Sequence, residues 1–394
     1  MTPPNLAHPG KPRPAARVSA SPMSVSARGS VSARGSASAR GSRSARRSPP
    51  RRPAPARGLA GSASGRIHPR LAFDHLGERE VTVAYEVHGP AAWGNRSATA
   101  LPTLVLGGIS AGRHLGPAHF DEGPGWWPGL VGCGLALDPA RRPLIGVDYL
   151  GGTGDASQNL RPVTTHDQAR AIAAVLDHLG IAEASFVGAS YGGMVALAFA
   201  ELFPERTGQL VILCAAHRTH PMATAVRSVQ RAAVGLGVDS GDTGRGLSLA
   251  RALAMTTYRS TREFEERFSP FALSAGSPGG DPARFPVEEY LEARGADFVR
   301  RFDTERFLAL SESIDLHRTR PGTMPEHALL ISFDTDILVP PWLMDELAAR
   351  DPDAESPARH LTIPSLYGHD AFLKETEAMS ALVHTQLHEE EAAR

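Results

Sequence analysis

Short apolar segments and longer amphipathic ones alternate along most of this chain, separated by glycine, proline and polar residues. The period-two pattern and the short apolar runs predict β-strands at residues 81–87, 101–106, 144–149, 185–187 and 210–214. Helical periodicity predicts helices at residues 164–179 and 194–202. In the first helix we expect Thr165 as the N-cap and Gln168 at the capping-box position. Because strands and helices alternate, we expect an α/β fold with a mostly parallel central sheet and helices on both faces.

The alternation stops after residue 215 and returns at residue 328. Between these points the apolar spacing predicts helices at residues 222–234, 247–257, 287–302 and 305–316, with a Gly- and Pro-rich break at 274–282. The alternating pattern then resumes, with predicted strands at 328–333 and 359–363 and predicted helices at 344–350 and 370–388. We therefore predict a core of residues 69–215 and 322–394, interrupted by a helical lid of residues 216–321. Such a lid covers the carboxyl ends of the strands, where ligands bind.

The first 68 residues differ from the rest in composition. They are rich in Pro, Ser, Ala, Gly and Arg, repeat a Val-Ser-Ala-Arg-Gly-Ser hexad, and precede the first acidic residue, Asp74. Three hypotheses are open: a disordered basic tail, an organelle transit peptide, or residues upstream of the true start codon. We favour the last, or inert disorder. Nucleic-acid binding is not expected, because stacking aromatic residues are absent there.

The remaining composition indicates a globular cytoplasmic protein. The chain has 394 residues, of which 42% are hydrophobic, and a formal net charge of −1. It contains no apolar run of membrane-spanning length and no secretory signal pattern, so we expect no membrane association. Cys133 and Cys214 lie in apolar surroundings. We expect both to be small buried residues with free thiols in a reducing compartment.

The strongest chemical signal is Gly188-Ala-Ser190-Tyr-Gly192, a G-x-S-x-G nucleophile elbow between a predicted strand and a predicted helix. In such an elbow the turn is too tight for side chains beside the serine, which is thereby exposed at the carboxyl end of the sheet. The backbone N–H of Tyr191 then lies at a helix N-terminus, where it can stabilise an oxyanion. Residues 108–112 match the same pattern around Ser110, but no helix follows, so we choose Ser190.

A nucleophilic serine needs a base that is held in one tautomer by an acid. In the order typical of α/β-hydrolases, the acid follows the serine and the histidine comes last. His369 occupies a loop after the last predicted strand. Asp334 and Asp336 both follow the strand at 328–333, and we choose Asp336 because it lies farther into the turn. The N–H of Ile109, after an early strand, is the second oxyanion donor that we predict.

His217 and His220 have metal-ligand spacing, but no further ligand cluster accompanies them in the sequence. We therefore predict no metal site.

Together these residues resemble the homoserine O-acyltransferases of methionine biosynthesis, which have the α/β-hydrolase fold. The resemblance spans residues 81–373. Besides the elbow, it rests on Gly125-Trp-Trp127, Gly132-Cys-Gly134 with Leu137-Asp138, Gly246-Leu-Ser-Leu-Ala-Arg251, Thr257-Tyr-Arg259, Tyr290-Leu291, Phe298-Val-Arg-Arg-Phe-Asp303, Thr335-Asp336 and Gly368-His-Asp-Ala-Phe-Leu373. Several of these segments lie in the predicted lid, which a generic hydrolase would not reproduce.

The resemblance implies a catalytic triad of Ser190, Asp336 and His369. It implies that Arg251 holds the carboxylate of L-homoserine and that Asp370 holds its ammonium group. The structural alternatives are a surface salt bridge for Arg251 and a helix N-cap for Asp370. It also implies acyl-CoA as co-substrate, no bound cofactor, and a homodimer formed through the helical insertion.

The acyl group is the open point. A succinyl group carries a carboxylate that an acetyl group lacks, and Arg113 and Arg218 are candidates to bind it. The chain most resembles the compact homoserine O-succinyltransferases of the xanthomonad group, yet Leu338 stands where some succinyl enzymes have arginine. We favour succinyl-CoA slightly over acetyl-CoA. A serine O-acyltransferase and a serine esterase are further alternatives.

Overall fold

The computed structural model describes residues 62–89, 101–116, 125–151, 160–276, 279–280, 282–320, 322, 324–325, 328–349 and 358–393. These residues all fall within one unit of the chain, Pro53–Arg394. The predicted tail up to residue 61 lies outside the described residues. Residues Ala63–Ile67, placed in the tail by composition, instead form strand β1. The sheet therefore starts earlier than the boundary that we predicted.

An eight-stranded sheet forms the centre of this unit, in the order β1-β4-β6-β5-β7-β8-β9-β10. The strands beyond β1 are β4 (Val83–His88), β5 (Thr103–Leu106), β6 (Leu144–Val147), β7 (Ala184–Ala189), β8 (Thr207–Leu213), β9 (Leu329–Phe333) and β10 (Arg359–Ile363). From β6 to β10 neighbouring strands pair in parallel. The pairs β1–β4 and β4–β6 are antiparallel. The predicted mostly parallel sheet is confirmed.

Helices cover both faces of this sheet. Successive residues of β7 alternate between two hydrophobic clusters: Phe186 packs with residues of α1 (Thr165–His178) and α2 (Tyr191–Leu202), while Val187 packs with residues of α10 (Thr376–Ala393). Because both faces are buried, the central strands are continuous apolar runs rather than alternating ones. Their hydrophobic packing holds the carboxyl ends of β7 and β9 in register.

The start of α1 differs from the sequence prediction. Thr164, not Thr165, is the N-cap, and Asp167, not Gln168, completes the capping box. The hydroxyl of Thr165 instead lies 2.8 Å from Nδ1 of His317. Burial lowers the pKa of His317 to about 3, so this ring is neutral. The amide of Gln168 bonds to both the N–H and the carbonyl of Leu150, at 2.8 and 3.0 Å. Both side chains therefore bond to residues outside the helix, and neither caps it.

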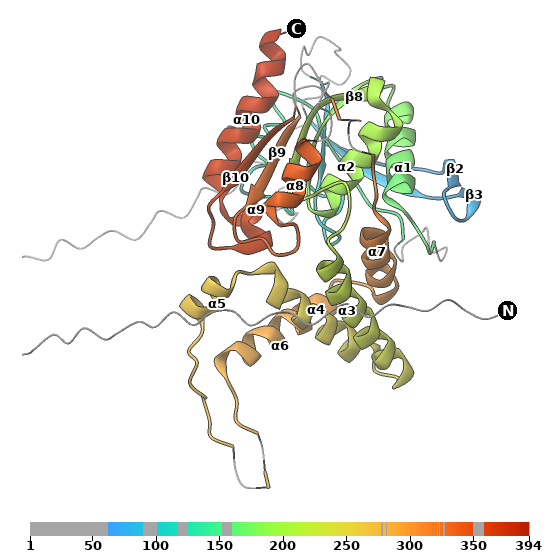
Figure 1. The fold of residues 1–394 in the computed structure, drawn as a ribbon. Coiled ribbons are helices and arrows are strands. Elements are labelled where there is room, and N and C mark those ends of the chain that lie inside the picture. Colours follow the sequence, from blue (N-terminus) through green and yellow to red (C-terminus); the bar gives the residue numbers. More distant parts are fainter. Residues whose placement is uncertain are drawn as a thin grey trace, which may run out of the picture. The chain divides into compact units, whose positions relative to one another are not determined.

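A helical segment separates β8 from β9, as predicted. It contains α3 (Pro221–Asp239), α4 (Thr243–Tyr258), α5 (Thr261–Arg267), α6 (Pro286–Val299) and α7 (Thr304–Leu316). Figure 1 shows α3 to α6 gathered beyond one end of the sheet strands. A small apolar cluster that includes Val234, Leu247 and Phe298 joins α3, α4 and α6. The short helix α5 was not predicted from the sequence.

Two further features went unpredicted. The hairpin of β2 (Arg70–Phe73) and β3 (Gly77–Glu80) forms a separate two-stranded sheet. The predicted helix at 370–388 is interrupted, because the turn Gly368–Asp370 and the short helix α9 (Ala371–Lys374) precede α10. This interruption bears on the site, since the turn carries His369. The chain between β9 and β10 forms α8 (Pro341–Ala348).

Candidate active site

Ser190 lies in the sharp turn between β7 and α2. Its backbone has φ 55° and ψ −123°, a strained conformation for a residue with a side chain. The turn requires glycine on both sides. A Cβ on Gly188 would lie 2.6 Å from the carbonyl oxygen of Gly192, and one on Gly192 would lie 2.3 Å from the backbone of Leu106. The predicted elbow is therefore present, and it places Ser190 at the carboxyl end of the central strand.

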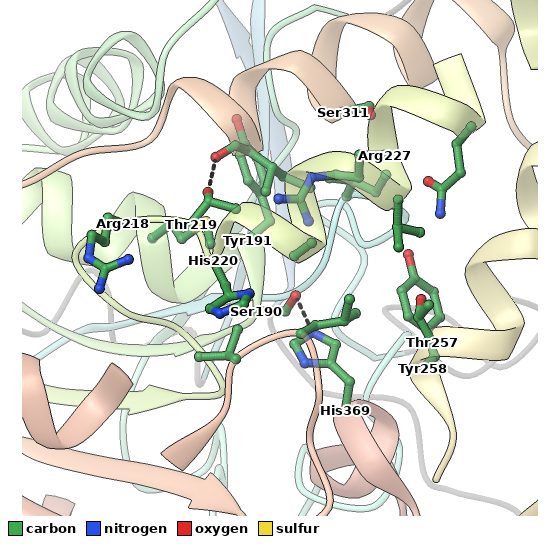
Figure 2. Close-up of a pocket in the computed structure, with 18 of the residues that line it drawn as sticks. Ser190, Tyr191, Arg218, Thr219, His220, Arg227, Thr257, Tyr258, Ser311 and His369 are labelled. Atoms are coloured by element: carbon green, nitrogen blue, oxygen red, sulfur yellow. Dashed lines mark hydrogen bonds between the residues drawn. The ribbon is translucent and has the colours of Figure 1, made fainter. Parts of the chain in front are cut away.

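Three polar side chains from distant segments form a continuous hydrogen-bond chain. The Oγ atom of Ser190 lies 2.8 Å from Nε2 of His369, a contact that Figure 2 shows as a dashed line. The Nδ1 atom of the same ring lies 2.7 Å from Oδ2 of Asp336. Asp336 and His369 are 3% and 6% exposed, so solvent hardly competes for these bonds. This is the geometry that a serine nucleophile, its base and an orienting acid require.

The turn after β9 separates the two aspartates that the sequence left as rivals. The second oxygen of Asp336, Oδ1, accepts hydrogen bonds from the N–H groups of Leu338 (2.8 Å) and Val339 (3.1 Å), which fix the carboxylate. Asp334 is exposed, and its carboxylate accepts a bond from the N–H of Ser365. Asp336 is therefore the residue that contacts His369.

The charges around His369 favour its protonated form. Burial by itself lowers the pKa of the ring, but the adjacent carboxylate of Asp336, helped by Asp370, outweighs burial and raises the pKa above 6.5. An imidazole with a raised pKa is a stronger proton acceptor. The ring also lies beside aromatic groups: its centroid is 6.0 Å from that of Tyr258.

The two predicted oxyanion donors lie beside this serine. Tyr191 is the first residue of α2, where backbone N–H groups have no intrahelical acceptor. Ile109 follows β5 and lines the same cavity as Ser190 and His369. Ser110, the rival match to the elbow pattern, is an exposed turn residue. The described residues that directly follow it, 111–116, form no helix, so Ser110 does not lie in a strand-to-helix elbow.

Arg251 and Asp370 are not among the residues that line the cavity beside Ser190, but each contacts or adjoins one that does, Tyr258 and His369 respectively. The guanidinium carbon of Arg251 is 5.3 Å from the ring centroid of Tyr258 and 4.8 Å from that of Phe298, so Arg251 makes cation–π contacts and has no salt-bridge partner among the described residues. Asp370 makes no capping bond to α9, although it occupies the N-cap position. Its carboxylate lies 3.2 Å from Nη2 of Arg259. Burial raises the pKa of Asp370, against the opposing effect of Arg259.

A cavity between the sheet end and the helical segment opens onto Ser190. Ile109, Tyr258, Leu338 and His369 line it together with residues of α3 and α7. Among the described residues that line it are two arginines, Arg218 and Arg227, and none is acidic. Figure 2 shows Arg218 and Tyr258 on opposite sides of Ser190, with the guanidinium of Arg227 extending toward the space between them. Sequence analysis missed Tyr258 and Arg227 as cavity residues.

Arg113, one of two arginines predicted to bind an acyl carboxylate, is engaged elsewhere. It pairs with Asp148, and its Nε lies 3.3 Å from Glu86. It is not among the residues lining the cavity. Arg218 does line the cavity, but its Nη2 lies 2.6 Å from Oε2 of Glu346.

The cysteines are both free, and only Cys214 is buried, so the expectation for Cys133 was wrong. Burial raises the pKa of the Cys214 thiol. Its sulfur, His369 and Asp336 offer ligand atoms within 4.8 Å of one another. Both nitrogens of His369 are already engaged by Ser190 and Asp336, so we assign this cluster to the hydrogen-bond chain. His220 caps α3, accepting a bond from the N–H of Met222.

Comparisons with known proteins agree with this geometry. The family model for the alpha/beta hydrolase fold matches residues 104–376. The chain is 41% identical to a homoserine O-succinyltransferase of Xanthomonas campestris pv. campestris, over 82% of this chain and 83% of that protein. It is 33% identical to a homoserine O-acetyltransferase of Thermus thermophilus, over 77% and 85% of the two chains.

A solved homoserine O-acetyltransferase from Bacillus anthracis superposes with a TM-score of 0.74 at 18% identity, covering 83% of this chain and 97% of that one. At this identity the superposition shows the fold. In the part of the chain that the structure describes, no helix is both long and apolar enough to cross a membrane. The sequence relatives and the family model show that the chain belongs to the homoserine O-acyltransferase family, within the α/β-hydrolase fold.

Proposed function

We propose that this protein transfers an acyl group from acyl-CoA to the hydroxyl of L-homoserine through an acyl-serine intermediate, a step of methionine biosynthesis. The observation that carries the proposal is the hydrogen-bond chain from Ser190 through His369 to Asp336. Family membership adds the acceptor and the co-substrate to this reactive centre.

In the first half-reaction, Oγ of Ser190 attacks the thioester carbonyl while Nε2 of His369 takes its proton. Asp336 holds the other ring nitrogen protonated and stabilises the imidazolium. The N–H groups of Tyr191 and Ile109 stabilise the tetrahedral oxyanion. The intermediate then collapses, the imidazolium returns the proton to the sulfur, and CoA leaves.

In the second half-reaction, the homoserine hydroxyl attacks the acyl-serine carbonyl and gives its proton to His369. The bond to Oγ of Ser190 then breaks, the imidazolium returns the proton to this oxygen, and O-acylhomoserine leaves. A zwitterionic acceptor is oriented by one cation and one anion, and we assign these roles to Arg251 and Asp370. Two observations support the assignment. Asp370 directly follows His369 and lacks a capping role, and Arg251 stacks on Tyr258, which lines the cavity.

Succinyl-CoA is the donor that we favour, with acetyl-CoA as the alternative. The relative at 41% identity is named for succinyl transfer, whereas those at 33% are named for acetyl transfer. The chemistry after donor binding is the same for both, so only the acyl pocket distinguishes them.

A serine esterase would use the same hydrogen-bond chain, with water as acceptor. For transfer to prevail, the site must exclude water from the acyl-serine. The low exposure of His369 and Asp336 supports such exclusion. A serine O-acyltransferase remains a further alternative, because L-serine differs from homoserine by one methylene.

The test is CoA release by the full chain with succinyl-CoA or acetyl-CoA, in the presence of L-homoserine, L-serine or no amino acid. We expect steady-state release that requires L-homoserine. Equal release without any amino acid would favour an esterase, and a preference for L-serine would change the acceptor.

We also propose a homodimer formed through the helical insertion. Exposed apolar side chains on α3 and α4 support this, namely Val229, Leu236 and Leu249, which are 57%, 71% and 55% exposed. Light scattering after size-exclusion chromatography tests it. A monomer at all concentrations would refute it.

A further inference from the structure

Helix α3 carries an arginine into the wall of the cavity above the reactive serine. The side chain of Arg227 is only 12% exposed and lines the cavity together with Ser190 and His369. In Figure 2 its guanidinium lies above Ser190 in the view, between Arg218 and Tyr258. The positive charge of Arg227 works against the net rise in the pKa of His369 that Asp336 causes.

Within the described residues the charge of Arg227 is only partly neutralised, although its Nε also donates a hydrogen bond to Asp315 at 2.8 Å. Its partner on α7, Asp315, is shared with a second arginine: Nη2 of Arg227 and Nη1 of Arg231 each lie 2.7 Å from its carboxylate. Two guanidinium groups and one carboxylate leave one positive charge. The buried Nη2 atom of Arg227 also makes no well-aligned hydrogen bond within the described part of the chain. A buried cation that is not fully paired is costly, and an anion that binds beside it removes part of this cost.

Arg218, the other arginine of this cavity, differs in both respects. It is the only arginine among the described residues that pairs with Glu346, at 2.6 Å, while the second oxygen of Glu346 lies 3.5 Å from Nε2 of His217; its guanidinium carbon lies 5.8 Å from the ring centroid of Trp342. At 28% exposure it is also more solvated than Arg227. Its charge is therefore the less available of the two.

We propose that Arg227 binds the distal carboxylate of a dicarboxylic acyl group attached to Ser190. This inference rests on the proposed function, and it makes succinyl-CoA the preferred donor. The far carboxylate of a succinyl group completes the charge balance of the Arg227, Asp315 and Arg231 cluster, whereas an acetyl group leaves the surplus charge unmatched. The amino-acid carboxylate goes to Arg251, which lies on a different helix, α4.

The experiment compares Arg227→Gln, Arg227→Lys and Arg218→Gln with the unchanged protein. Each is assayed for CoA release with L-homoserine and succinyl-CoA, acetyl-CoA or butyryl-CoA, the last being an uncharged acyl group of the same carbon number as succinyl. We expect Arg227→Gln to lower the ratio of kcat/KM for succinyl-CoA to that for acetyl-CoA by about 10- to 100-fold, the effect of losing a charge-assisted hydrogen bond. The kcat/KM for butyryl-CoA should respond to Arg227→Gln as that for acetyl-CoA does. Arg227→Lys should retain part of the preference for succinyl-CoA.

The matched control, Arg218→Gln, should change the same ratio by less than about threefold, because Arg218 is already paired with Glu346. The inference is overturned if Arg227→Gln leaves the ratio unchanged, which includes an equal loss of kcat/KM for both donors. It is overturned too if the substitution chiefly raises the KM for homoserine. It is also overturned if Arg218→Gln has the larger effect. If Arg227→Gln does not fold, Arg227→Lys must still lower the ratio.

The unchanged protein separates this inference from the proposed function. Homoserine-dependent CoA release with a preference for acetyl-CoA would sink the inference alone. No homoserine-dependent release with any donor would sink the proposed function.

Discussion

The Nε2 atom of His369 lies 2.8 Å from Oγ of Ser190, although 179 positions of chain separate the two residues. The parallel sheet produces this contact, because β7, β9 and β10 end at the same edge. Each reactive side chain lies just beyond one of these ends or in the loops that follow. The strained turn at Ser190 and the turn Gly368–Asp370, which carries His369, then bring the two side chains within hydrogen-bond distance.

Replacing Asp336 with Asn should lower kcat by about 10⁴-fold, because the amide would hold His369 in the wrong tautomer. Asp334→Asn is the matched control. Asp334 is exposed, and its carboxylate accepts a hydrogen bond from the N–H of Ser365 rather than contacting His369, so we expect a change of less than about threefold. Steady-state CoA release measures both variants. Comparable losses in the two would contradict the assignment of the acid.

The pH dependence follows from the raised pKa of His369. The ring accepts a proton only when it is neutral, so activity should fall as pH drops through a pKa above 6.5. Because Asp370 contributes to raising that pKa, Asp370→Asn should move the acid limb to lower pH.

The rapid first release of CoA without homoserine is the suitable signal for this shift, since it does not depend on amino-acid binding. Asp239→Asn, at the exposed end of α3, should leave the limb in place. An acid limb at or below 6.5 in the unchanged protein would refute this electrostatic account.

Arg251→Met should impair the second half-reaction and spare the first. We expect kcat/KM for homoserine to fall by about 100-fold, the effect of losing a charge-assisted contact to a carboxylate, while the first release of CoA stays normal. Arg245→Met is the control, as Arg245 is exposed on the same helix. Impaired acylation in Arg251→Met would indicate a structural role instead.

The elbow glycines should be intolerant of even a methyl group. In Gly192→Ala the new Cβ would lie 2.3 Å from the backbone of Leu106, so we expect a loss of unfolding free energy of about 2 kcal/mol or more. A Cβ on Gly235, within α3, meets nothing within 4 Å. Gly235→Ala should therefore stabilise the protein by about 0.5–1 kcal/mol. Denaturant melts measure both, and changes of the same sign would contradict this view of the elbow.

The sequence predicted the sheet, its interruption and the three residues of the hydrogen-bond chain because each has a local signature. Buried strands are continuous apolar runs, and Ser190, Asp336 and His369 follow strands in the order that this fold requires. The choice of Asp336 over Asp334 depended only on distance beyond the strand, and the observed contact agrees with it.

Features defined by tertiary contacts escaped sequence analysis. Arg227 resembles any polar residue on an amphipathic helix, and its partner Asp315 lies 88 positions away. Thr164 and Thr165 are equivalent caps by pattern, and the contact of Thr165 with His317 decides between them. Strand β1 has a composition close to that of the tail before it, so only its pairing with β4 reveals it.

The most direct test of the account is the acylation of Ser190 itself. The full chain is mixed with succinyl-CoA without homoserine, quenched in acid, digested and analysed by mass spectrometry, with Ser190→Ala as control. We predict that the peptide containing Ser190 gains one succinyl group and loses it when L-homoserine is added, with formation of O-succinylhomoserine. Acylation at another residue, or equally fast loss of the acyl group without L-homoserine, would contradict the account.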